Sequence, residues 1–345
     1  MEPHPRSVEY LTTTLDPQLI ANFLQSEMPI RYAERIRALE KVPEWRRIPD
    51  LVDVHEIHID SFKSFRSSTP ENFAETSHKA LLTEQPVVEK LAKSVHQLRN
   101  DVGEDISDEF VSKFLDDFLL NRIGCHVLLG HYLACRAGQK NGIIDIRCDT
   151  GLVCRAAAKA VAEMCVECTG SRPHVSVHAH SACGGKGVDD GQVPRFPYMP
   201  HVLKYIVGEL LKNSCRATID ILKAHDVHAA DFPIKVIICA DEDHVTICVA
   251  DQAGGIPREA NAWSYLYTTA KDGYGGSRKL AGHGVGLPLS RLYARYLGGS
   301  LDLVSLPGYG THAYINLPRV QSQQVEVVPD ADYTYDYASL LDFTV

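Results

Sequence analysis

The stretch GHGVGLPLSRLYARYLGGSLDLVSLPGYGTHAYINL, residues 282–317, decides the fold of this chain. Its glycines lead directly into Pro288, a residue that fits the first turn of a helix. Backbone N–H groups at such a helix start form an anion site that suits phosphates. The apolar spacing then predicts a helix and a strand hairpin that turns at Pro307–Gly310. The stretch therefore predicts a phosphate-binding turn beside a β-sheet.

Other glycine-rich phosphate loops compete as interpretations of Gly282, Gly284 and Gly286. A Rossmann loop has the spacing G-x-G-x-x-G directly after a strand, whereas this sequence has G-x-G-x-G with no strand immediately before it. A P-loop would need G-K followed by Ser or Thr. The H-R-D, D-F-G and V-A-I-K motifs of ordinary protein kinases are also absent.

A second segment is ELLKN, residues 209–213, inside the long helix predicted for residues 201–225. Glu209 and Asn213 are four positions apart, so their side chains share one helix face. Magnesium prefers oxygen ligands and keeps several waters, and the amide oxygen of Asn213 suits it beside phosphates. Such a pair alone is also common on solvated helices, so its meaning depends on the neighbouring segments.

A third segment, DQAGG at residues 251–255, follows the predicted strand VTICVA. The carboxylate of Asp251 can accept a hydrogen bond from the amino group of adenine, and the two glycines let a base approach the backbone. An aspartate in an ordinary turn is the alternative. Together with a fourth segment, the glycine turn at Gly308–Thr311, the four segments predict a nucleotide site.

The composition limits the classes of protein to consider. A length of 345 residues suggests about two domains. With 45% apolar and 23% charged residues, the chain is neither wholly disordered nor collagen-like. A net charge of -9 argues against nucleic acid as a partner. Because the sequence has no apolar run of about 18 residues, we expect no membrane-spanning helix.

Two domains and a tail are expected. Residues 1–140 carry apolar residues at three- and four-residue spacing, which predicts a four-helix-bundle-like domain. The first break in composition is GQKNG at 138–142, and residues 141–320 then alternate strand and helix patterns. These patterns predict an α/β sandwich with a mixed sheet and helices on one face, so the fold class is α+β, with a tail at 321–345. Helix breaks are expected at Pro29, Pro43, Pro49, Pro70 and Pro86.

The ten cysteines lie scattered in apolar segments, which is typical of buried free thiols in a reducing compartment. Cys165 and Cys168 form a C-x-x-C without a second pair at zinc spacing, so core packing is the main interpretation and a metal or redox site the alternative. A second candidate metal site comprises His174, His178, His180 and Cys183. The segment HVSVHAH alternates like a strand, which disfavours a metal site there.

The order, spacing and setting of the four segments resemble the ATP-binding fold shared by gyrase, Hsp90, sensor histidine kinases and MutL. Longer stretches resemble the mitochondrial 2-oxoacid dehydrogenase kinases, that is, the pyruvate dehydrogenase kinases and the branched-chain 2-oxoacid dehydrogenase kinase. The likeness extends from about residue 18 to 320. Its stretches are MPIRYAERIRALEKVP (28–43), NRIGCHVLL (121–129), PHVLKYIVGELLKNSCRAT (200–218) and TTAKDGYGGSRKLAGHGVGLPLSRLYARYLGGSL (268–301).

The resemblance implies an ATP- and magnesium-dependent protein serine kinase. Members of this family phosphorylate the E1α subunit of a 2-oxoacid dehydrogenase complex and inactivate it, and they dock on the lipoyl domain of the E2 subunit. We expect the pyruvate dehydrogenase complex to be the target, with the branched-chain complex as the alternative. A homodimer in the mitochondrial matrix follows from the same likeness. The first ten residues, MEPHPRSVEY, resemble neither a signal peptide nor a presequence, so we expect either none or one that was removed.

Site residues carry over from the resemblance position by position. Glu209 matches the general base that takes the proton from the serine hydroxyl, and Asn213 matches the magnesium ligand. The glycine-rich segment 268–282 is expected to close over the nucleotide as a lid. Phe23, Ile36, Leu39 and Phe62 of the helical domain are candidates for docking, with core packing as the alternative. The ATP-binding residues are expected to be Glu209, Lys212, Asn213, Arg216, Asp251, Gly255, Thr268, Thr269, Gly282, His283, Gly284, Val285, Gly286, Leu287 and Thr311.

Several positions depart from the family pattern. Ala253 replaces a usual glycine, and its methyl group could crowd the nucleotide. Tyr205 stands where many pyruvate-type members have a histidine, and we expect this phenol to orient Glu209 rather than to share its protons near neutral pH. These departures leave nucleotide binding intact but affect the expected E1 preference and tail docking. The remaining departures are Gly124, His126, His283 and the Asp336-Tyr337 pair.

Other functions share the ATP-binding fold. A histidine kinase would need a phosphoacceptor histidine, for which His131 is the nearest candidate. A chaperone or topoisomerase would need a transducer domain after the ATP domain, and we expect none in the 25 residues that follow residue 320. A regulator that binds ATP without turnover is the third alternative.

Overall fold

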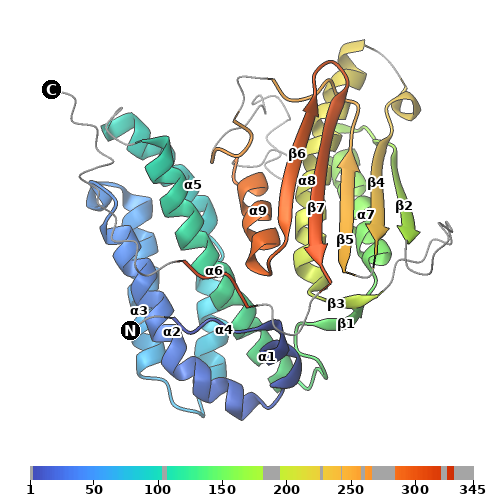
Figure 1. Cartoon of the computed structure of the whole chain (residues 1–345). Coiled ribbons are helices and arrows are strands. Elements are labelled where there is room, and N and C mark those ends of the chain that lie inside the picture. Colours follow the sequence, from blue (N-terminus) through green and yellow to red (C-terminus); the bar gives the residue numbers. More distant parts are fainter. Residues whose placement is uncertain are drawn as a thin grey trace. The chain divides into compact units, whose positions relative to one another are not determined.

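The computed structural model describes residues 3–102, 107–181, 195–225, 228–241, 243–257, 261–265, 284–319 and 325–329. The chain forms two compact units. The first comprises Met1–Ile143, Ser264–Leu266 and Val325–Val345, and the second comprises Ile144–Trp263 and Tyr267–Gln324. The first unit is helical and the second contains the β-sheet (Figure 1).

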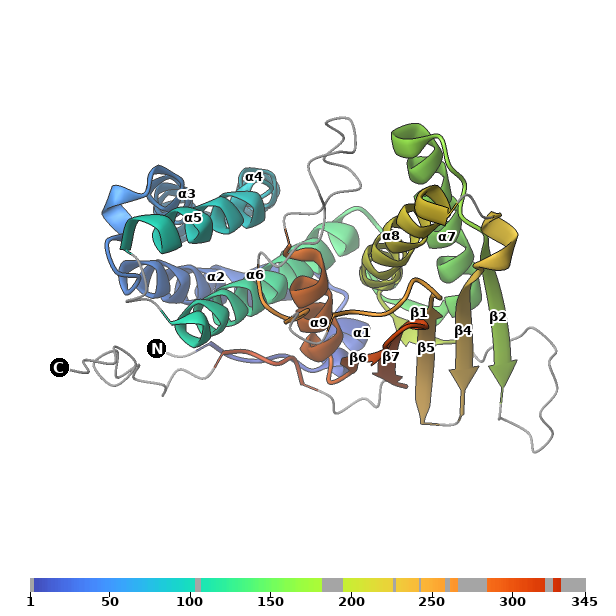
Figure 2. The same ribbon diagram turned by 90° about the horizontal axis from the view of Figure 1, so that it is seen from above.

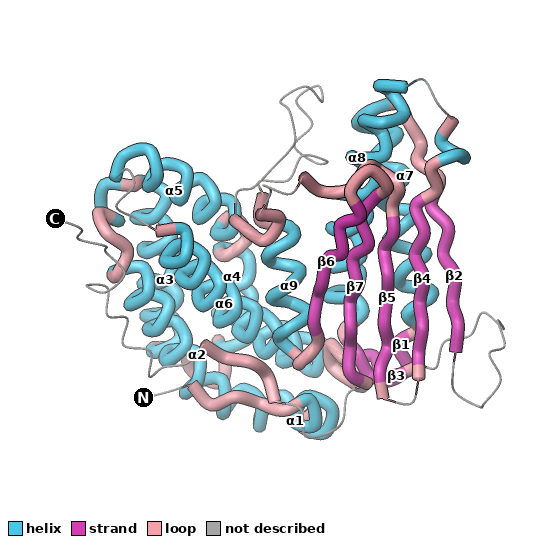
Figure 3. The backbone as a smooth tube through the Cα atoms, turned by 45° about the horizontal axis from the view of Figure 1, so that its top comes forward, coloured by secondary structure: helices cyan, strands magenta, loops and turns pink. Residues whose placement is uncertain are grey.

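The described part of the first unit is a helical bundle (Figure 3). Its long helices α2, α3, α5 and α6 pack side by side, with α4 against α3 and α6. Buried aromatic rings from α2, α3 and α6 fill its centre, among them Tyr32, Phe65 and Phe118. The elements are α1 (Val8–Thr13), α2 (Pro17–Glu40), η1 (Trp45–Arg47), α3 (Pro49–Arg66), α4 (Phe73–Thr83), α5 (Val87–Val102) and α6 (Asp108–Arg136).

One expected helix break is wrong. Helix α2 continues through Pro29, although a proline removes a helix hydrogen bond and costs about 3 kcal/mol in a helix interior. Asp16 caps its start by accepting from the N–H of Gln18, and the side chains of Leu24, Met28 and Tyr32 are buried along it. Burial of this apolar face outweighs the local cost of Pro29.

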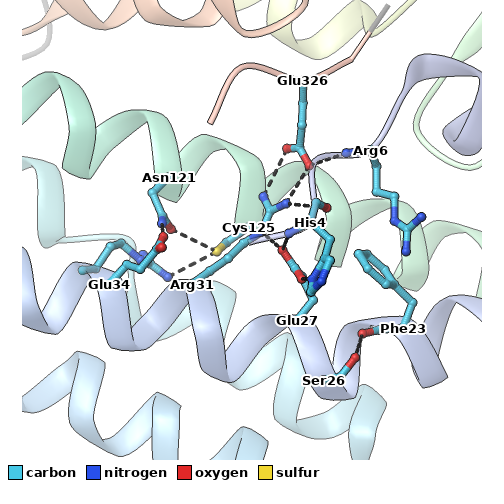
Figure 4. Close-up of polar contacts among 11 residues, drawn as sticks. His4, Arg6, Phe23, Ser26, Glu27, Arg31, Glu34, Asn121, Cys125 and Glu326 are labelled. Carbon is cyan, nitrogen blue, oxygen red and sulfur yellow. Dashed lines mark hydrogen bonds and ion pairs between the residues drawn. The ribbon is translucent and has the colours of Figure 1, made fainter. Parts of the chain in front are cut away.

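Two clusters of buried charge lie inside the first unit. In one, the guanidinium of Arg31 bonds to the carboxylates of Glu27 and Glu326, and Glu27 also accepts from the backbone N–H of His4 (Figure 4). Glu326 therefore ties a segment after the last strand to helix α2. Because both carboxylates share one guanidinium, neither is left as an unpaired buried charge.

The second cluster surrounds Glu84 at the C-terminal end of α4. Its carboxylate accepts from Arg35 at 2.9 Å and lies 2.9 Å from the Nε2 atom of His126. Burial alone would raise the pKa of Glu84, but Arg35 and His126 bring it well below its usual value. His126, one of the departures from the family pattern, is thus a partner of this carboxylate, and Arg122 lies 3.5 Å from it on the same side of α6.

The second unit is built on a five-stranded mixed sheet with the strand order β2-β4-β5-β7-β6. Strands β2 and β4 are parallel, and the other neighbours are antiparallel. Its described elements are β1 (Asp145–Cys148), α7 (Thr150–Thr169), β2 (Val175–Ser181), β3 (Phe196–Tyr198), α8 (Pro200–His225), η3 (Ala229–Asp231), β4 (Ile234–Ala240), β5 (His244–Ala250), α9 (Gly286–Tyr296), β6 (Ser300–Leu306) and β7 (Gly310–Pro318).

Helices α7, α8 and α9 cover one face of this sheet (Figure 2). The alternating side chains of β4, such as Ile234, Val236 and Ile238, are buried toward them. The expected α+β fold, with a helical region followed by a mixed sheet with helices on one face, is confirmed. Strand β1 does not join this sheet but pairs with β3, a three-residue strand that the sequence pattern did not predict.

Among the described residues, no helix is long and apolar enough to cross a membrane. Nine cysteines in that part of the chain are free thiols, and most are buried, including Cys165. Cys183 lies outside the described residues. The described part of the chain also holds no cluster of three or more His, Cys, Asp or Glu side chains that could bind a metal ion.

Candidate active site

A cavity of about 400 Å³ opens in the second unit between helix α8, the start of α9 and the ends of β5 and β7. It is lined by side chains from all four segments that the sequence singled out. The expected site residues that line it are Glu209, Lys212, Asn213, Arg216, Asp251, Gly255, Gly284, Gly286, Leu287 and Thr311.

Helix α8 supplies the charged wall of the cavity. Glu209 and Asn213 lie one turn apart, as the spacing predicted, and Lys212 forms an ion pair with the Oε1 atom of Glu209. Both charged side chains are mostly buried, with 16% of Glu209 and 19% of Lys212 exposed. A carboxylate therefore lines the cavity beside a cation that can stabilise either this carboxylate or a bound anion.

The start of α9 meets Glu209 directly. A Cβ atom at Gly286 would overlap with the Oε2 atom of Glu209. Gly286 begins α9 and lines the cavity, so the first turn of this helix lies beside an acidic side chain. Glycine at this position therefore leaves room for the carboxylate, a steric reason for this residue type.

Asp251 is fixed at the end of β5. Its Oδ1 atom accepts from the backbone N–H groups of Ala253 at 3.0 Å and Thr311 at 3.2 Å. The backbone N–H of Asp251 in turn donates to the carbonyl of Thr311. A Cβ atom at Gly310 would overlap with the carbonyl oxygen of Asp251, so this close approach of β7 to β5 requires glycine. The third segment, at Asp251–Gly255, and the fourth segment, at Gly308–Thr311, are thus two sides of one structure.

Arg216 adds a second cation to the cavity wall. Burial lowers the pKa of its guanidinium from the usual value, and the carboxylate of Asp220 opposes this effect. An arginine side chain keeps its proton under such a shift, because its ordinary pKa lies far above neutrality. Lys212 and Arg216 together give the wall two positive charges suited to the phosphates of a nucleotide.

The oxygen atoms in the cavity fit a magnesium ion held with phosphates. Magnesium usually keeps several waters and takes one or two protein oxygens together with substrate phosphates. Asn213 is exposed, lines the cavity and carries an amide oxygen one turn from the Glu209 carboxylate. One such ligand beside a phosphate site matches this mode of binding.

Some expected residues cannot be placed. Thr268, Thr269, Gly282 and His283 lie outside the described residues, as does the expected lid at 268–282. Val285 is described and forms the N-cap position of α9.

The structure also brings to the cavity residues that the sequence did not single out. Ser214 lines it from α8 and donates from its Oγ atom to the Oδ2 atom of Asp251 at 2.8 Å. The only signal in the sequence for a role of Ser214 was its position directly after Asn213. Its contact with Asp251 depends on the fold, so sequence patterns could not predict it. Apolar side chains form the wall that a base would contact: Ile221, Val249, Ile256, Leu303 and Ala313.

His131, the candidate phosphoacceptor of a histidine kinase, is fully buried in α6. Its Nε2 atom lies 3.2 Å from the carbonyl oxygen of Thr14, and burial lowers the pKa of the ring although this contact opposes the effect. A phosphoacceptor side chain must reach the terminal phosphate of ATP, and a buried ring in the core of a helical unit does not offer that access.

Comparison with known proteins agrees with this site. Residues 10–160 match the family model described as mitochondrial branched-chain alpha-ketoacid dehydrogenase kinase, and residues 200–321 match the histidine kinase-, DNA gyrase B- and HSP90-like ATPase family. An Arabidopsis thaliana mitochondrial pyruvate dehydrogenase (acetyl-transferring) kinase is 32% identical over 88% of this chain and 86% of its own length. The chain belongs to the 2-oxoacid dehydrogenase kinase family.

Other members of the 2-oxoacid dehydrogenase kinase family are similar over the same extent. The mitochondrial pyruvate dehydrogenase (acetyl-transferring) kinase of Drosophila melanogaster is 29% identical over 89% of this chain and 79% of its own length. The human isozyme 4 is 29% identical over 89% of this chain and 78% of its own length. The recognition of this kinase family and of its ATPase-type domain from the sequence is therefore confirmed.

Proposed function

We propose that this chain is a protein serine kinase that uses ATP to phosphorylate, and so inactivate, the E1α subunit of a mitochondrial pyruvate dehydrogenase complex. The observation that carries the proposal is the meeting of all four sequence segments around one cavity in a member of this kinase family. The relatives that support pyruvate dehydrogenase as the target are named for it and are mitochondrial. The mitochondrial matrix, where the complex works, is the proposed location.

Each wall of the cavity has a role in this proposal. Asp251 accepts a hydrogen bond from the amino group of adenine, and Thr311 and Gly255 border the base. The backbone N–H groups at residues 284–287, with Lys212 and Arg216, bind the phosphates. Asn213 holds magnesium, which neutralises phosphate charge when bound.

Glu209 is the proposed general base. Its carboxylate lines the cavity beside Gly286, in the proposed phosphate-binding turn, and a serine hydroxyl of a docked protein would approach it there. The carboxylate accepts the hydroxyl proton as the serine oxygen attacks the terminal phosphorus of ATP, and the bond from that phosphorus to the bridging oxygen breaks so that ADP leaves. Lys212 beside the carboxylate holds the side chain in place. Positioning of the two reactants then supplies most of the acceleration.

A labelled-phosphate experiment tests this function and its closest alternative. The family model that matches residues 10–160 carries the branched-chain description, so the branched-chain complex is the second candidate target. The full chain is incubated with purified pyruvate or branched-chain complex and ATP labelled in the terminal phosphate. We expect acid-stable label on serine of pyruvate E1α, and loss of complex activity. Label only on the branched-chain E1α would reassign the target, and label on neither would leave a regulator that binds ATP without turnover.

The helical unit is the proposed docking site for the lipoyl domain of E2. Ile36 and Leu39 are buried and fill its core, so core packing explains them. Phe23 and Phe62 are half-buried, so these two of the four residues expected to dock remain candidates. Recovery of the full chain on lipoylated and unlipoylated E2 domains tests docking, and equal recovery on both would contradict it.

A homodimer through the sheet is the last part of the proposal. Ile237, Cys248 and Tyr314 are register neighbours on three adjacent strands and lie on the sheet face opposite the packed helices. Ile237 and Tyr314 are partly exposed there, which suits a self-complementary contact between two copies. Sedimentation of the wild type and of Ile237→Lys tests this surface, and an unchanged mass for the variant would contradict it.

A further inference from the structure

Among the described residues, three hydrogen bonds hold the carboxylate of Asp251, and they divide its two oxygens unequally. Oδ1 accepts from two backbone N–H groups, those of Ala253 and Thr311. Oδ2 accepts from the hydroxyl of Ser214 at 2.8 Å. A carboxylate oxygen offers about two acceptor sites, so Oδ1 is filled and Oδ2 keeps one site. Asp251 is 5% exposed and lines the cavity, so a ligand there can reach only this remaining site.

We infer that Ser214 is a specificity-determining positioning residue, which fixes Asp251 so that the remaining acceptor site of Oδ2 meets the 6-amino group of adenine. This inference rests on the proposed function, in which Asp251 binds the base. Ser214 acts through Asp251 rather than on the reacting atoms. Its side chain is 7% exposed, lines the same cavity and belongs to the helix that carries Glu209 and Asn213.

The hydroxyl of Ser214 matters because it restrains the carboxylate at its second oxygen. The terminal torsion of aspartate is broad, and rotation about it moves both oxygens together. The bond from Ser214 to Oδ2 adds to the two bonds on Oδ1 and narrows the range over which the group can rotate. Hydrogen bonds to a charged group are also stronger than neutral ones, so this contact restrains the carboxylate effectively.

A fixed acceptor at this point discriminates between purines. Adenine places an amino donor there, whereas a 6-oxo purine places a carbonyl oxygen against the carboxylate. Sites built to bond a particular donor reject analogues without it strongly, because the buried acceptor is left without a partner. The hydroxyl of Ser214 already donates its proton to Asp251, so toward a ligand its oxygen can only accept a hydrogen bond.

Nucleotide titrations of the full chain with magnesium test the inference. The probes are ATP and purine riboside triphosphate, which lacks the 6-amino group. Ser214→Ala should weaken ATP binding about 10-fold, as expected for loss of a hydrogen bond to a charged group, and leave binding of purine riboside triphosphate nearly unchanged. At saturating ATP its turnover should stay within a few-fold of wild type, since the change affects KM rather than kcat. Ser214→Thr, which keeps the hydroxyl, should restore the preference for ATP.

Two further variants separate the possible failures. Thr218→Val removes another buried hydroxyl one turn along α8, outside the cavity wall, and should change neither affinity. Asp251→Asn should weaken ATP binding severely. If Asp251→Asn binds ATP as the wild type does, the proposed adenine site is wrong. If Asp251→Asn fails while Ser214→Ala loses affinity equally for both probes or for neither, the assignment of Ser214 is overturned and the site stands.

Discussion

Arg31 and Glu326 lie 295 positions apart in the sequence and form a two-pronged contact in the interior of the helical unit, with N–O distances of 2.6 and 3.1 Å. The contact is almost wholly screened from solvent. Around it, the backbone N–H of Glu326 donates to the carbonyl of Arg6, and Val325 bridges to Ser7. The two ends of the described chain are thus held on α2 by one guanidinium (Figure 4).

Arg31→Met should destabilise the helical unit strongly. The substitution leaves Glu27 and Glu326 as buried carboxylates without their cation, and breaking a buried pair in this way costs about 3–5 kcal/mol. Denaturant unfolding measures the change in free energy. Arg47→Met is the matched control, because Arg47 pairs with Glu44 at the surface, and it should shift stability by less than about 0.5 kcal/mol. Similar stability of the two variants would show that the buried contact contributes little.

Glu34→Gln should flatten the pH dependence of stability. Burial raises the pKa of Glu34 from 4.5 to about 7, with Arg31 opposing. Between these values the folded chain keeps a proton that the unfolded chain releases, so the free energy of unfolding falls as pH rises through this window. Above pH 7 the variant should therefore be more stable than the wild type. Thermal unfolding from pH 4 to 8 measures this, with exposed Glu109→Gln as the control; a parallel pair of profiles for Glu34→Gln and wild type would contradict the prediction.

The sequence predicted the parts of the fold that depend on local pattern. Periodicity located the helices and most strands. The glycine segments located the cavity, because Gly286 lies close to the side chain of Glu209 and Gly310 close to the backbone of Asp251, and only glycine fits there. Pro29 was misjudged, since a local rule gave way to burial of the α2 face. The strand Phe196–Tyr198 is too short for an alternation signal.

Contacts between distant segments could not be predicted at all. Nothing in the sequence near Glu326 indicates that it pairs with Arg31, and nothing near Ser214 indicates that it bonds to Asp251. Both contacts depend on how helices and strands pack, which single-sequence patterns do not encode. The sequence therefore yielded, from residue type and spacing, many of the residues that line the cavity, and missed the contacts that hold them in position.

Gly286→Ala should impair phosphoryl transfer more than nucleotide binding. A Cβ atom at this position overlaps with the Oε2 atom of Glu209, so the carboxylate must move. Displacement of a catalytic group by about 1 Å can cost on the order of 10²-fold in rate. Turnover on E1α and titration with MgATP measure the two effects separately.

The control for this prediction is Gly208→Ala, on helix α8 next to Glu209. A Cβ atom at Gly208 meets no atom within 4 Å, so the variant should keep its turnover and gain a little helix stability. If Gly286→Ala turns over like Gly208→Ala, the space for Glu209 is not limiting. If it loses nucleotide affinity in proportion to its turnover, Gly286 serves the phosphates alone.

Glu209 and Asn213 lie one turn apart on α8, and their substitution should separate chemistry from binding. Asn213 is the proposed magnesium ligand, so Asn213→Ala should weaken MgATP binding and abolish transfer. Glu209 is the proposed base for the incoming hydroxyl, and Glu209→Gln keeps the size of the side chain but removes its basicity. This variant should bind MgATP within a few-fold of wild type and lose on the order of 10²–10⁴ in E1α phosphorylation.

Nucleotide titration and transfer of labelled phosphate to E1α are measured on the same preparations of each variant. Lys212 complicates Glu209→Gln, because loss of the carboxylate frees its ammonium to approach the phosphates. Binding of MgATP by Glu209→Gln should therefore become equal to or tighter than that of wild type, and Lys212→Met in the same background should remove the gain. Transfer by Glu209→Gln at a rate near that of wild type would show that Glu209 is not the base, and α8 would then only hold the nucleotide.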